Sequence, residues 1–274
     1  MNTRPALIDK ERFGPWALVT GESSGIGREF ARQLAAHGLN VVLAARRIVE
    51  LDALGRELAQ EFGVQHRAVM VDLTMDDALR TIEEATRDLD LGLLVSNAGT
   101  GIPGEFLSAK RDDLLSIVRL NVHAHLDLAH HFGRRLAKRG RGGILLVSAL
   151  GAAQGIPYMA NAGATKAFVL SLGEALHVEF EKLGVNLTVL LPGPTATPVL
   201  AEFGIEFDKL PIKPIPVEQC VSEALRALNA NRATIMPGRL TRFVHALVPD
   251  SVSRGIIAQM FTRALAMKAK PVTP

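Results

Sequence analysis

Residues 19–34 read VTGESSGIGREFARQL, a glycine-rich turn between an apolar run and a segment of helical periodicity. Gly21, Gly25 and Gly27 permit a tight turn and a close approach of the backbone to a pyrophosphate. The helix that follows offers free N–H donors and a partial positive charge. A glycine triplet alone also fits a plain turn, but a preceding strand and a following helix are the context that phosphate binding requires. The stretch therefore predicts a phosphate cradle in an α/β fold.

Short apolar runs alternate with amphipathic segments over the first 200 residues. The runs are almost continuously apolar, as in strands that are buried on both faces of a parallel sheet. This alternation predicts a doubly wound, Rossmann-type α/β sheet with helices on both faces. No linker interrupts the pattern, so we expect a single domain over residues 1–274 with its core in 14–200. The expected strands are 16–20, 40–45, 68–73, 91–96, 143–148, 186–192 and 234–237, and the expected helices are 25–38, 47–62, 75–89, 111–138, 160–183 and 217–230.

The pattern changes after residue 193, where the chain becomes rich in proline. This change predicts a loop, and we expect a substrate lid over residues 194–230. Residues 238–274 interleave basic and apolar side chains and form a basic amphipathic tail. Such a tail can lie on an anionic membrane. Docking on the protein's own core or on a partner subunit is the interpretation we favour, and the membrane remains the alternative.

The composition narrows the class of protein. With 48% hydrophobic and 22% charged residues, the chain can bury a sizeable core and is not expected to be disordered. A formal net charge of +3 indicates an ordinary solvated surface, so no nucleic-acid partner is predicted. The single cysteine, Cys220, excludes an internal disulfide framework and fits a reducing compartment. Neither a signal peptide nor a membrane-spanning run is recognisable, so we expect a soluble, cytoplasmic protein, and we predict no metal site.

The spacing of the first two glycines, with two serines between them, resembles the short-chain dehydrogenase/reductase family. The resemblance covers about residues 14–200 and includes the NAG turn at 97–99 and the segment PGPTATP at 192–198. It implies a nicotinamide cofactor site. The cofactor-binding residues that it implies are Gly21, Ser23, Ser24, Gly25, Ile26, Gly27, Arg46, Arg47, Asp72, Leu73, Asn97, Ala98, Gly99, Lys166, Pro192, Gly193, Thr195 and Thr197.

The end of the second expected strand indicates which cofactor is preferred. It reads AARR, where NAD-preferring proteins usually place an acid for the ribose hydroxyls. Arg46 and Arg47 can instead pair with a 2′-phosphate, so NADP(H) is the expected cofactor. Outside this context, two arginines after a strand would be only an exposed helix start.

The expected active site lacks its two reactive hydroxyls. In the family, a serine binds the substrate oxygen, and a tyrosine transfers the proton with its pKa lowered by a lysine one helical turn later. Lys166 and Asn121 match the family's lysine and asparagine. Alanine stands at the two remaining positions, Ala149 for the serine and Ala162 for the tyrosine. Both could also be substitutions introduced into an ordinary reductase.

Several neighbouring side chains could take over the missing roles. Tyr158, the only tyrosine, lies eight residues before Lys166 and is a tentative catalytic residue, although a substrate-lining or packing role is favoured. Ser148 is expected to face away from the substrate, because successive strand residues point to opposite faces. His123 and His125 follow Asn121, and we expect them to be solvated or at a subunit interface.

Three functions remain open. The favoured one is an NADP(H)-dependent oxidoreductase with an atypical proton donor, which could be Tyr158, a water held by Lys166 and Asn121, or the substrate itself. The alternatives are a catalytically silent cofactor-binding protein, acting as a sensor or partner subunit, and a lyase or isomerase using the same pocket. The apolar lid and tail suggest a small hydrophobic substrate of acyl or steroid type. The resemblance also implies a homodimer or homotetramer.

Overall fold

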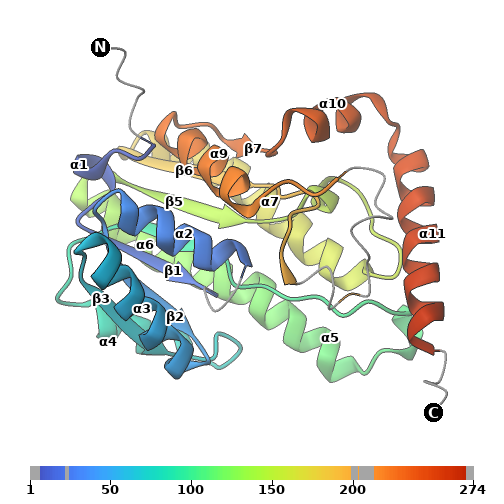
Figure 1. The fold of residues 1–274 in the computed structure, drawn as a ribbon, viewed down its shortest axis with the longest axis horizontal. Helices are drawn as coiled ribbons and strands as arrows, with labels where there is room; N and C mark the ends of the chain where they lie inside the picture. Colours follow the sequence, from blue (N-terminus) through green and yellow to red (C-terminus); the bar gives the residue numbers. More distant parts are fainter. Residues whose placement is uncertain (1–6, 22–24, 199–202, 204–212, 270–274) are drawn as a thin grey trace.

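The computed structural model describes residues 7–21, 25–198, 203 and 213–269. Within them a sheet of seven parallel strands runs in the order β3-β2-β1-β4-β5-β6-β7 (Figure 1). The predicted doubly wound sheet is thereby confirmed. The chain order reverses between β1 and β4, which is where open sheets of this kind bind ligands. The strands are β1 (Trp16–Thr20), β2 (Asn40–Ala45), β3 (His66–Met70), β4 (Leu91–Ser96), β5 (Gly142–Val147), β6 (Val185–Leu190) and β7 (Thr234–Ile235).

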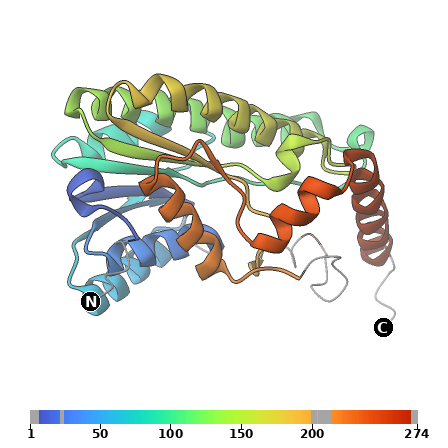
Figure 2. The same cartoon turned by 90° about the horizontal axis from the view of Figure 1, so that it is seen from above.

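Helices cover both faces of this sheet (Figures 1 and 2). Side chains of α2, α3 and α9 join one core cluster, and those of α4, α6 and α7 join the cluster on the opposite face. Both faces are sealed, which explains why the strands are apolar along their whole length. The helices are α1 (Lys10–Phe13), α2 (Gly25–Ala36), α3 (Ile48–Phe62), α4 (Ala78–Thr86), α5 (Arg111–Val118), α6 (Ala124–Arg139), α7 (Ala160–Glu181), α9 (Val217–Asn229), α10 (Arg239–Leu247) and α11 (Asp250–Ala269).

Most of the expected boundaries are shifted by one to three residues, and two of the differences have a clear local cause. The single helix expected over 111–138 is interrupted by a π-helical turn at Arg119–His123, which separates α5 from α6. Single π-helical turns within α-helices are frequently found at functional sites. The strand expected over 68–73 ends at Met70, because Asp72 accepts hydrogen bonds from the backbone and hydroxyl of Thr74 and turns the chain.

The lid expected over residues 194–230 is only partly compatible with the structure. α9 occupies the end of that range and is a core element, with Cys220, Leu225 and Leu228 fully buried. Its apolar periodicity drives this burial against α2 and the sheet. The part of the predicted lid before α9 lies mostly outside the described residues, so the lid stays a prediction there.

The C-terminal helices lie beyond the carboxyl ends of the strands (Figures 1 and 2). The inner side of α11 packs on the core, where buried Phe261 joins Ile117, Met159 and Ala162 in one apolar cluster. This part of the tail docks on its own chain. No helix among the described residues has both the length and the hydropathy that are needed to cross a membrane.

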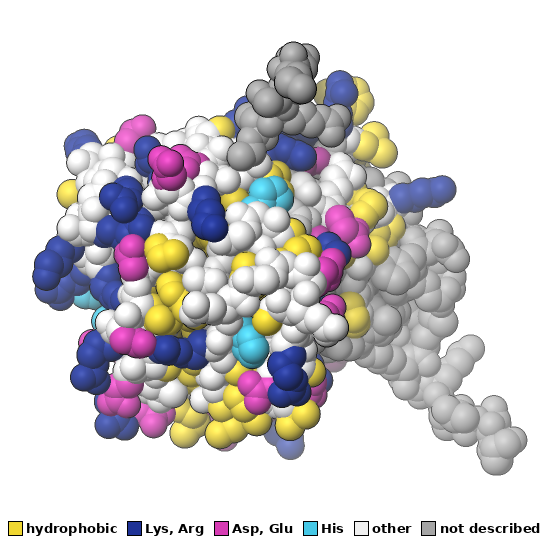
Figure 3. Space-filling view, turned by 60° about the vertical axis from the view of Figure 1, so that its left-hand side comes forward, with side chains coloured by type: hydrophobic (Ala, Val, Ile, Leu, Met, Phe, Trp, Pro, Cys, Tyr) yellow, Lys and Arg dark blue, Asp and Glu magenta, His cyan; other side chains and the backbone are white. Residues whose placement is uncertain are grey.

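Charged side chains of both signs share the surface. On the face seen in Figure 3, Lys and Arg are interspersed with Asp and Glu. Some form ion pairs between elements, such as Arg67 with Asp88 at 2.6 Å. On this face the modest basic excess is spread out and does not form a single basic patch.

The packing of α11 predicts that Phe261→Ala destabilises the fold by about 3 kcal/mol, since a buried aromatic ring is replaced by a cavity. Urea denaturation should report the change as a lower midpoint. Ile256→Ala is the matched control on the exposed side of the same helix and should have little effect. Equal midpoints for the two variants would mean that α11 is not docked.

Candidate cofactor and active site

The turn after β1 is locked to the turn after β4. Thr20 Oγ1 accepts hydrogen bonds from the backbone N–H groups of Asn97 at 3.0 Å and Ala98 at 3.1 Å. Asn97 Nδ2 donates in return to the Thr20 carbonyl oxygen at 2.9 Å. Gly21, with a φ of 72°, fits between them, because a Cβ there would lie 2.8 Å from the Ala98 Cα. Only glycine satisfies both the positive φ and this close approach.

The segment expected to grip the nicotinamide lies against the start of α2. A Cβ at Gly25, whose φ is 59°, would be 3.3 Å from Thr197 Cγ2. The first N–H groups of α2, from Gly25 through Ile26 and buried Gly27, are where a helix attracts an anion. Ser23 and Ser24 lie outside the described residues. The described part of the predicted cradle is Gly21 and the first turn of α2, and its role in binding a pyrophosphate stays a prediction.

The remaining part of that segment is anchored to the loop after β5. Leu150 donates its N–H to the Pro192 carbonyl oxygen at 2.9 Å, and Thr195 Oγ1 donates to the Gly193 carbonyl oxygen at 3.0 Å. Thr241 of α10 packs on Gly193, where a Cβ would lie 3.0 Å from its methyl carbon. The described part of the segment is thus held in place from two sides.

The expected adenine-ribose end carries exposed positive charge. Arg46 and Arg47 are both exposed, and Arg47 lies 3.4 Å from Glu50. Burial alone would raise the pKa of the Asp72 carboxyl, but hydrogen bonds from Thr74 and the charge of Arg46 outweigh it and hold that pKa below its ordinary value. Leu73 is partly buried against the core. Arg46 and Asp72 are therefore neighbours, as a shared binding role requires.

The head of Lys166 lies between the end of β5 and the NAG turn. Its Nζ donates to the Val147 carbonyl oxygen at 2.8 Å. A Cβ at Gly99 would lie 2.8 Å from the same nitrogen, so the glycine is needed for the lysine to pass. Burial lowers the pKa of Lys166 to about 8. The ammonium is therefore close to releasing a proton at neutral pH.

Asn121 joins the loop after β4 to α7. It is fully buried on the π-helical turn, and its Nδ2 donates to the Thr100 carbonyl oxygen at 2.8 Å and to Thr165 Oγ1 at 2.9 Å. Its Oδ1 accepts from the Thr100 N–H at 2.9 Å. Both amide protons are used, which leaves one lone pair of Oδ1 for a further partner.

The space beside Ala162 is occupied by a methionine. Ala162 lies one helical turn before Lys166 and is buried, and Met159 packs with it in the apolar cluster. A Cβ at Gly101 would be 2.5 Å from Met159 Cε and 3.1 Å from the Ala162 Cβ. Ala149 follows β5 in an extended conformation, with a φ of −158°. Neither alanine carries a group that could bind or protonate a substrate oxygen.

The polar neighbours of these alanines are directed elsewhere. Ser148 Oγ donates to the Lys166 carbonyl oxygen at 2.7 Å, so it faces the backbone of α7. Asn161 Nδ2 donates to the Leu114 carbonyl oxygen at 2.9 Å. Tyr158 is half-buried against the apolar cluster and has a φ of 62°, an uncommon conformation for a bulky residue. Its catalytic role remains a prediction.

His125 is the residue that sequence reasoning missed. The expected solvated or interface position is wrong for it, since its side chain is 1% exposed and its Nδ1 lies 2.7 Å from Ser96 Oγ. Its Nε2 has no hydrogen-bond partner among the described residues. Burial, and then the charge of Lys166, lower its pKa to about 3. The available signal was its spacing of four from Asn121, which places both on one side of the helical segment.

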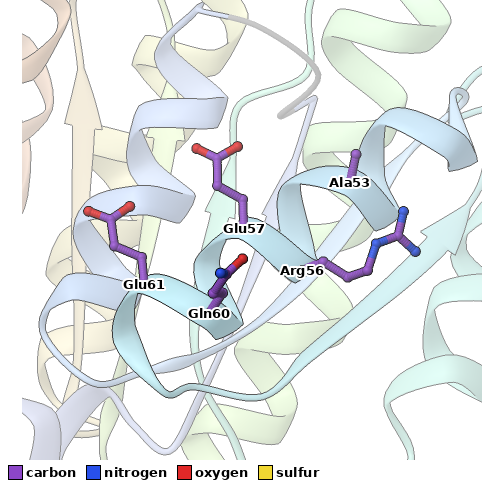
Figure 4. Close-up of a pocket in the computed structure, with 5 residues that line it drawn as sticks. All are labelled: Ala53, Arg56, Glu57, Gln60 and Glu61. Carbon is purple, nitrogen blue, oxygen red and sulfur yellow. The ribbon is translucent and has the colours of Figure 1, made fainter.

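A surface hollow on α3 does not belong to this site. It is lined by α3 residues whose carboxylates pair with arginines of α2, Glu57 with Arg28 at 2.6 Å and Glu61 with Arg32 at 2.8 Å. These pairs hold the two helices together. The lining residues are Ala53, Arg56, Glu57, Gln60 and Glu61 (Figure 4).

Comparison with known proteins gives the same assignment as the geometry. The family model for short chain dehydrogenases matches residues 15–206. The chain belongs to the short-chain dehydrogenase/reductase family of oxidoreductases.

Individual relatives cover almost the whole chain. A 7beta-hydroxysteroid dehydrogenase of Collinsella aerofaciens is 31% identical over 86% of this chain and 91% of its own length. A very-long-chain 3-oxoacyl-CoA reductase-like protein of Arabidopsis thaliana is 31% identical over 91% and 83%. The structure of a short-chain dehydrogenase from Sphingobium yanoikuyae in complex with NADPH is 30% identical, with a TM-score of 0.77 over 95% of this chain and 98% of that one.

The depressed pKa of His125 predicts a pH-dependent stability. Below the unfolded value of about 6.5 the unfolded chain binds a proton that the folded chain refuses until about pH 3. Stability should therefore fall with decreasing pH across this window, by up to about 1.4 kcal/mol per pH unit from this residue.

Urea denaturation at pH 7.5 and pH 5.0 measures this effect. The loss of stability between the two pH values should be smaller in His125→Gln than in the unaltered protein. His130→Gln, an exposed position on the same helix, is the control and should keep the full pH dependence. An unchanged pH dependence in His125→Gln would contradict the assignment.

Proposed function

We propose that the protein is an NADP(H)-dependent oxidoreductase that acts on a hydrophobic carbonyl or hydroxyl compound with altered proton-transfer machinery. One observation carries the proposal: the cradle, the NAG turn and Lys166 form one connected arrangement, while Ala149 and Ala162 stand where the reactive hydroxyls are expected. A bound nicotinamide supplies or accepts the hydride. The residues of this chain bind, orient and handle the proton.

The cofactor is held by three groups of residues. The glycines at the start of α2 and its free N–H groups bind the pyrophosphate. Arg46 and Arg47 pair with the 2′-phosphate of NADP(H), and their exposure leaves them available for it. Thr195 and Thr197 orient the nicotinamide end. The Sphingobium yanoikuyae relative, whose structure contains NADPH, supports this choice of cofactor.

The substrate is hydrophobic. Next to Lys166 the chain offers the apolar cluster of Met159, Ala162 and Phe261, with Tyr158 and Met260 packed against it. The relatives named for hydroxysteroids and for very-long-chain 3-oxoacyl-CoA support a steroid or acyl compound. Tyr158 lines this space and is the alternative proton donor.

The proton comes from the Lys166 ammonium through a water that it holds, which leaves a neutral amine. Two of the three N–H groups of its ammonium remain after the bond to Val147, and a pKa of about 8 suits proton transfer near neutral pH. The free lone pair of Asn121 Oδ1 can hold the same water. Because a positioned general acid contributes about 10²–10⁴-fold in rate, slow turnover of simple ketones follows.

A catalytically silent NADP(H)-binding protein is the second candidate. It is favoured by the commitment of Ser148 and Asn161 to backbone carbonyls, which leaves neither free to replace a missing hydroxyl. Either function is compatible with a homodimer or homotetramer, the assembly we propose for this chain.

Cofactor preference tests the binding half of the proposal. NADPH should bind at least about tenfold more tightly than NADH, because charge-assisted pairs with the 2′-phosphate are lost with NADH. Arg46→Gln with Arg47→Gln should remove the preference in titration calorimetry. Arg80→Gln, an exposed arginine on α4, is the control. Equal affinity of the unaltered protein for both cofactors would refute the assignment.

Restoring the hydroxyls tests the catalytic half. Ala149→Ser with Ala162→Tyr should raise NADPH-dependent ketone reduction by about 10²-fold, since it supplies the oxygen-binding hydroxyl and the acid beside Lys166. Because Met159 fills that space, adding Met159→Ala should increase the gain.

Tyr158→Phe in the unaltered background is the control and should change little. Brisk turnover by the unaltered protein that Tyr158→Phe abolishes would identify Tyr158 as the acid. NADPH binding without any turnover, even with substrates of the steroid and acyl classes, would favour the silent protein.

A further inference from the structure

The outer side of α10 exposes three large apolar residues. Leu240, Phe243 and Leu247 are 60%, 63% and 64% exposed, and their spacing of three and four places them on one face of the helix. On the opposite side, Thr241 is buried against Gly193. The apolar face of this amphipathic helix therefore points away from the core, which is the reverse of an ordinary surface helix.

α11 repeats the pattern on its first turns. Val252 and Ile256, four residues apart, are 52% and 44% exposed. Phe261 and Ala264 on the inner side are each 5% exposed and pack on the core. α11 is thus apolar toward the protein and also toward solvent, and its docking on the core leaves the outer residues uncovered.

The charges around these residues are positive. Arg239, Arg254 and Arg263 are exposed, and Arg242 lies 2.9 Å from Glu223. Asp250 is the single acidic residue in the sequence from 239 to 265. An apolar stripe flanked by arginines matches a surface with an anionic outer layer and an apolar interior.

We propose that the outer face of α10 and the first turns of α11 dock on the surface of an anionic lipid bilayer. The apolar side chains enter the acyl boundary, and the flanking arginines pair with lipid phosphates. A second copy of this chain fits less well. In a two-fold contact each patch meets itself, so the arginines of one copy would face those of the other.

This docking has a consequence for the substrate, which rests on the proposed function. Both helices lie at the end of the molecule beyond the carboxyl ends of the strands, and the inner side of α11 covers the apolar cluster beside Lys166 (Figures 1 and 2). A docked protein would hold that cluster next to the membrane. A lipophilic substrate could then reach the pocket from the bilayer.

Vesicle co-sedimentation of the full chain tests the docking directly. The protein should pellet with vesicles of phosphatidylcholine containing about one-third phosphatidylglycerol, and less with phosphatidylcholine alone. Phe243→Ser with Leu247→Ser should lower the partition coefficient about tenfold or more. Arg239→Glu with Arg254→Glu should abolish the preference for phosphatidylglycerol. The matched controls on α3, Val49→Ser and Arg56→Glu, should bind as the unaltered protein does.

Several outcomes would overturn the proposal. The proposal is wrong if the protein does not pellet with anionic vesicles. It is also wrong if Phe243→Ser with Leu247→Ser does not reduce pelleting, or if the α3 controls reduce it equally. A dimer seen by light scattering that Phe243→Ser with Leu247→Ser dissociates, without vesicle binding, would assign the face to a second copy. NADPH affinity, measured on the same samples, shows whether each variant is folded and reports separately on the proposed function.

Discussion

The site depends on the hydrogen bonds that tie the end of β1 to the end of β4. Thr20 receives two backbone N–H groups from the NAG turn, and Asn97 returns a bond to the backbone of β1. This lock brings Gly21 onto Ala98 so closely that no side chain fits between them. The chain order reverses here, and Gly21 and Lys166 Nζ both come close to the NAG turn. The hydrogen bonds that join these two strand ends therefore also fix the position of the predicted cofactor site.

The sequence predicted the features that depend on local patterns. Continuous apolar runs predicted the first and last residues of β1, β2 and β4 correctly. Strands that are buried on both faces are apolar along their whole length, so each run begins and ends with its strand. The π-helical turn was not predictable, since it depends on Asn121 reaching a loop and a helix that are distant in sequence. The helix over 217–230 is predictable, but its place in the core is not, because its partner, α2, lies far away along the chain.

His125 shows the same limit at the level of a single side chain. A histidine within a helix is often solvated, and the partner of His125, Ser96, lies 29 residues earlier, at the end of β4. The structure buries the ring between the strand and the lysine instead. The alanines, in contrast, were visible in the sequence, but Met159 filling the adjacent space was not. The packing of Met159 with Ala162 is a contact that a sequence motif cannot reveal.

Lys166 carries the remaining argument for chemistry at this site. A pKa lowered from 10.5 to about 8 means that folding the charged lysine costs about 3 kcal/mol. The cost is fully present below pH 8 and disappears as the pH rises toward 10.5, because the folded chain then buries a neutral amine. Its one protein hydrogen bond, to Val147, does not need an ionisable donor. An uncharged side chain of similar length would fill the space at a lower cost in folding free energy. A partly buried ammonium beside the NAG turn is therefore better explained by binding or proton transfer than by packing.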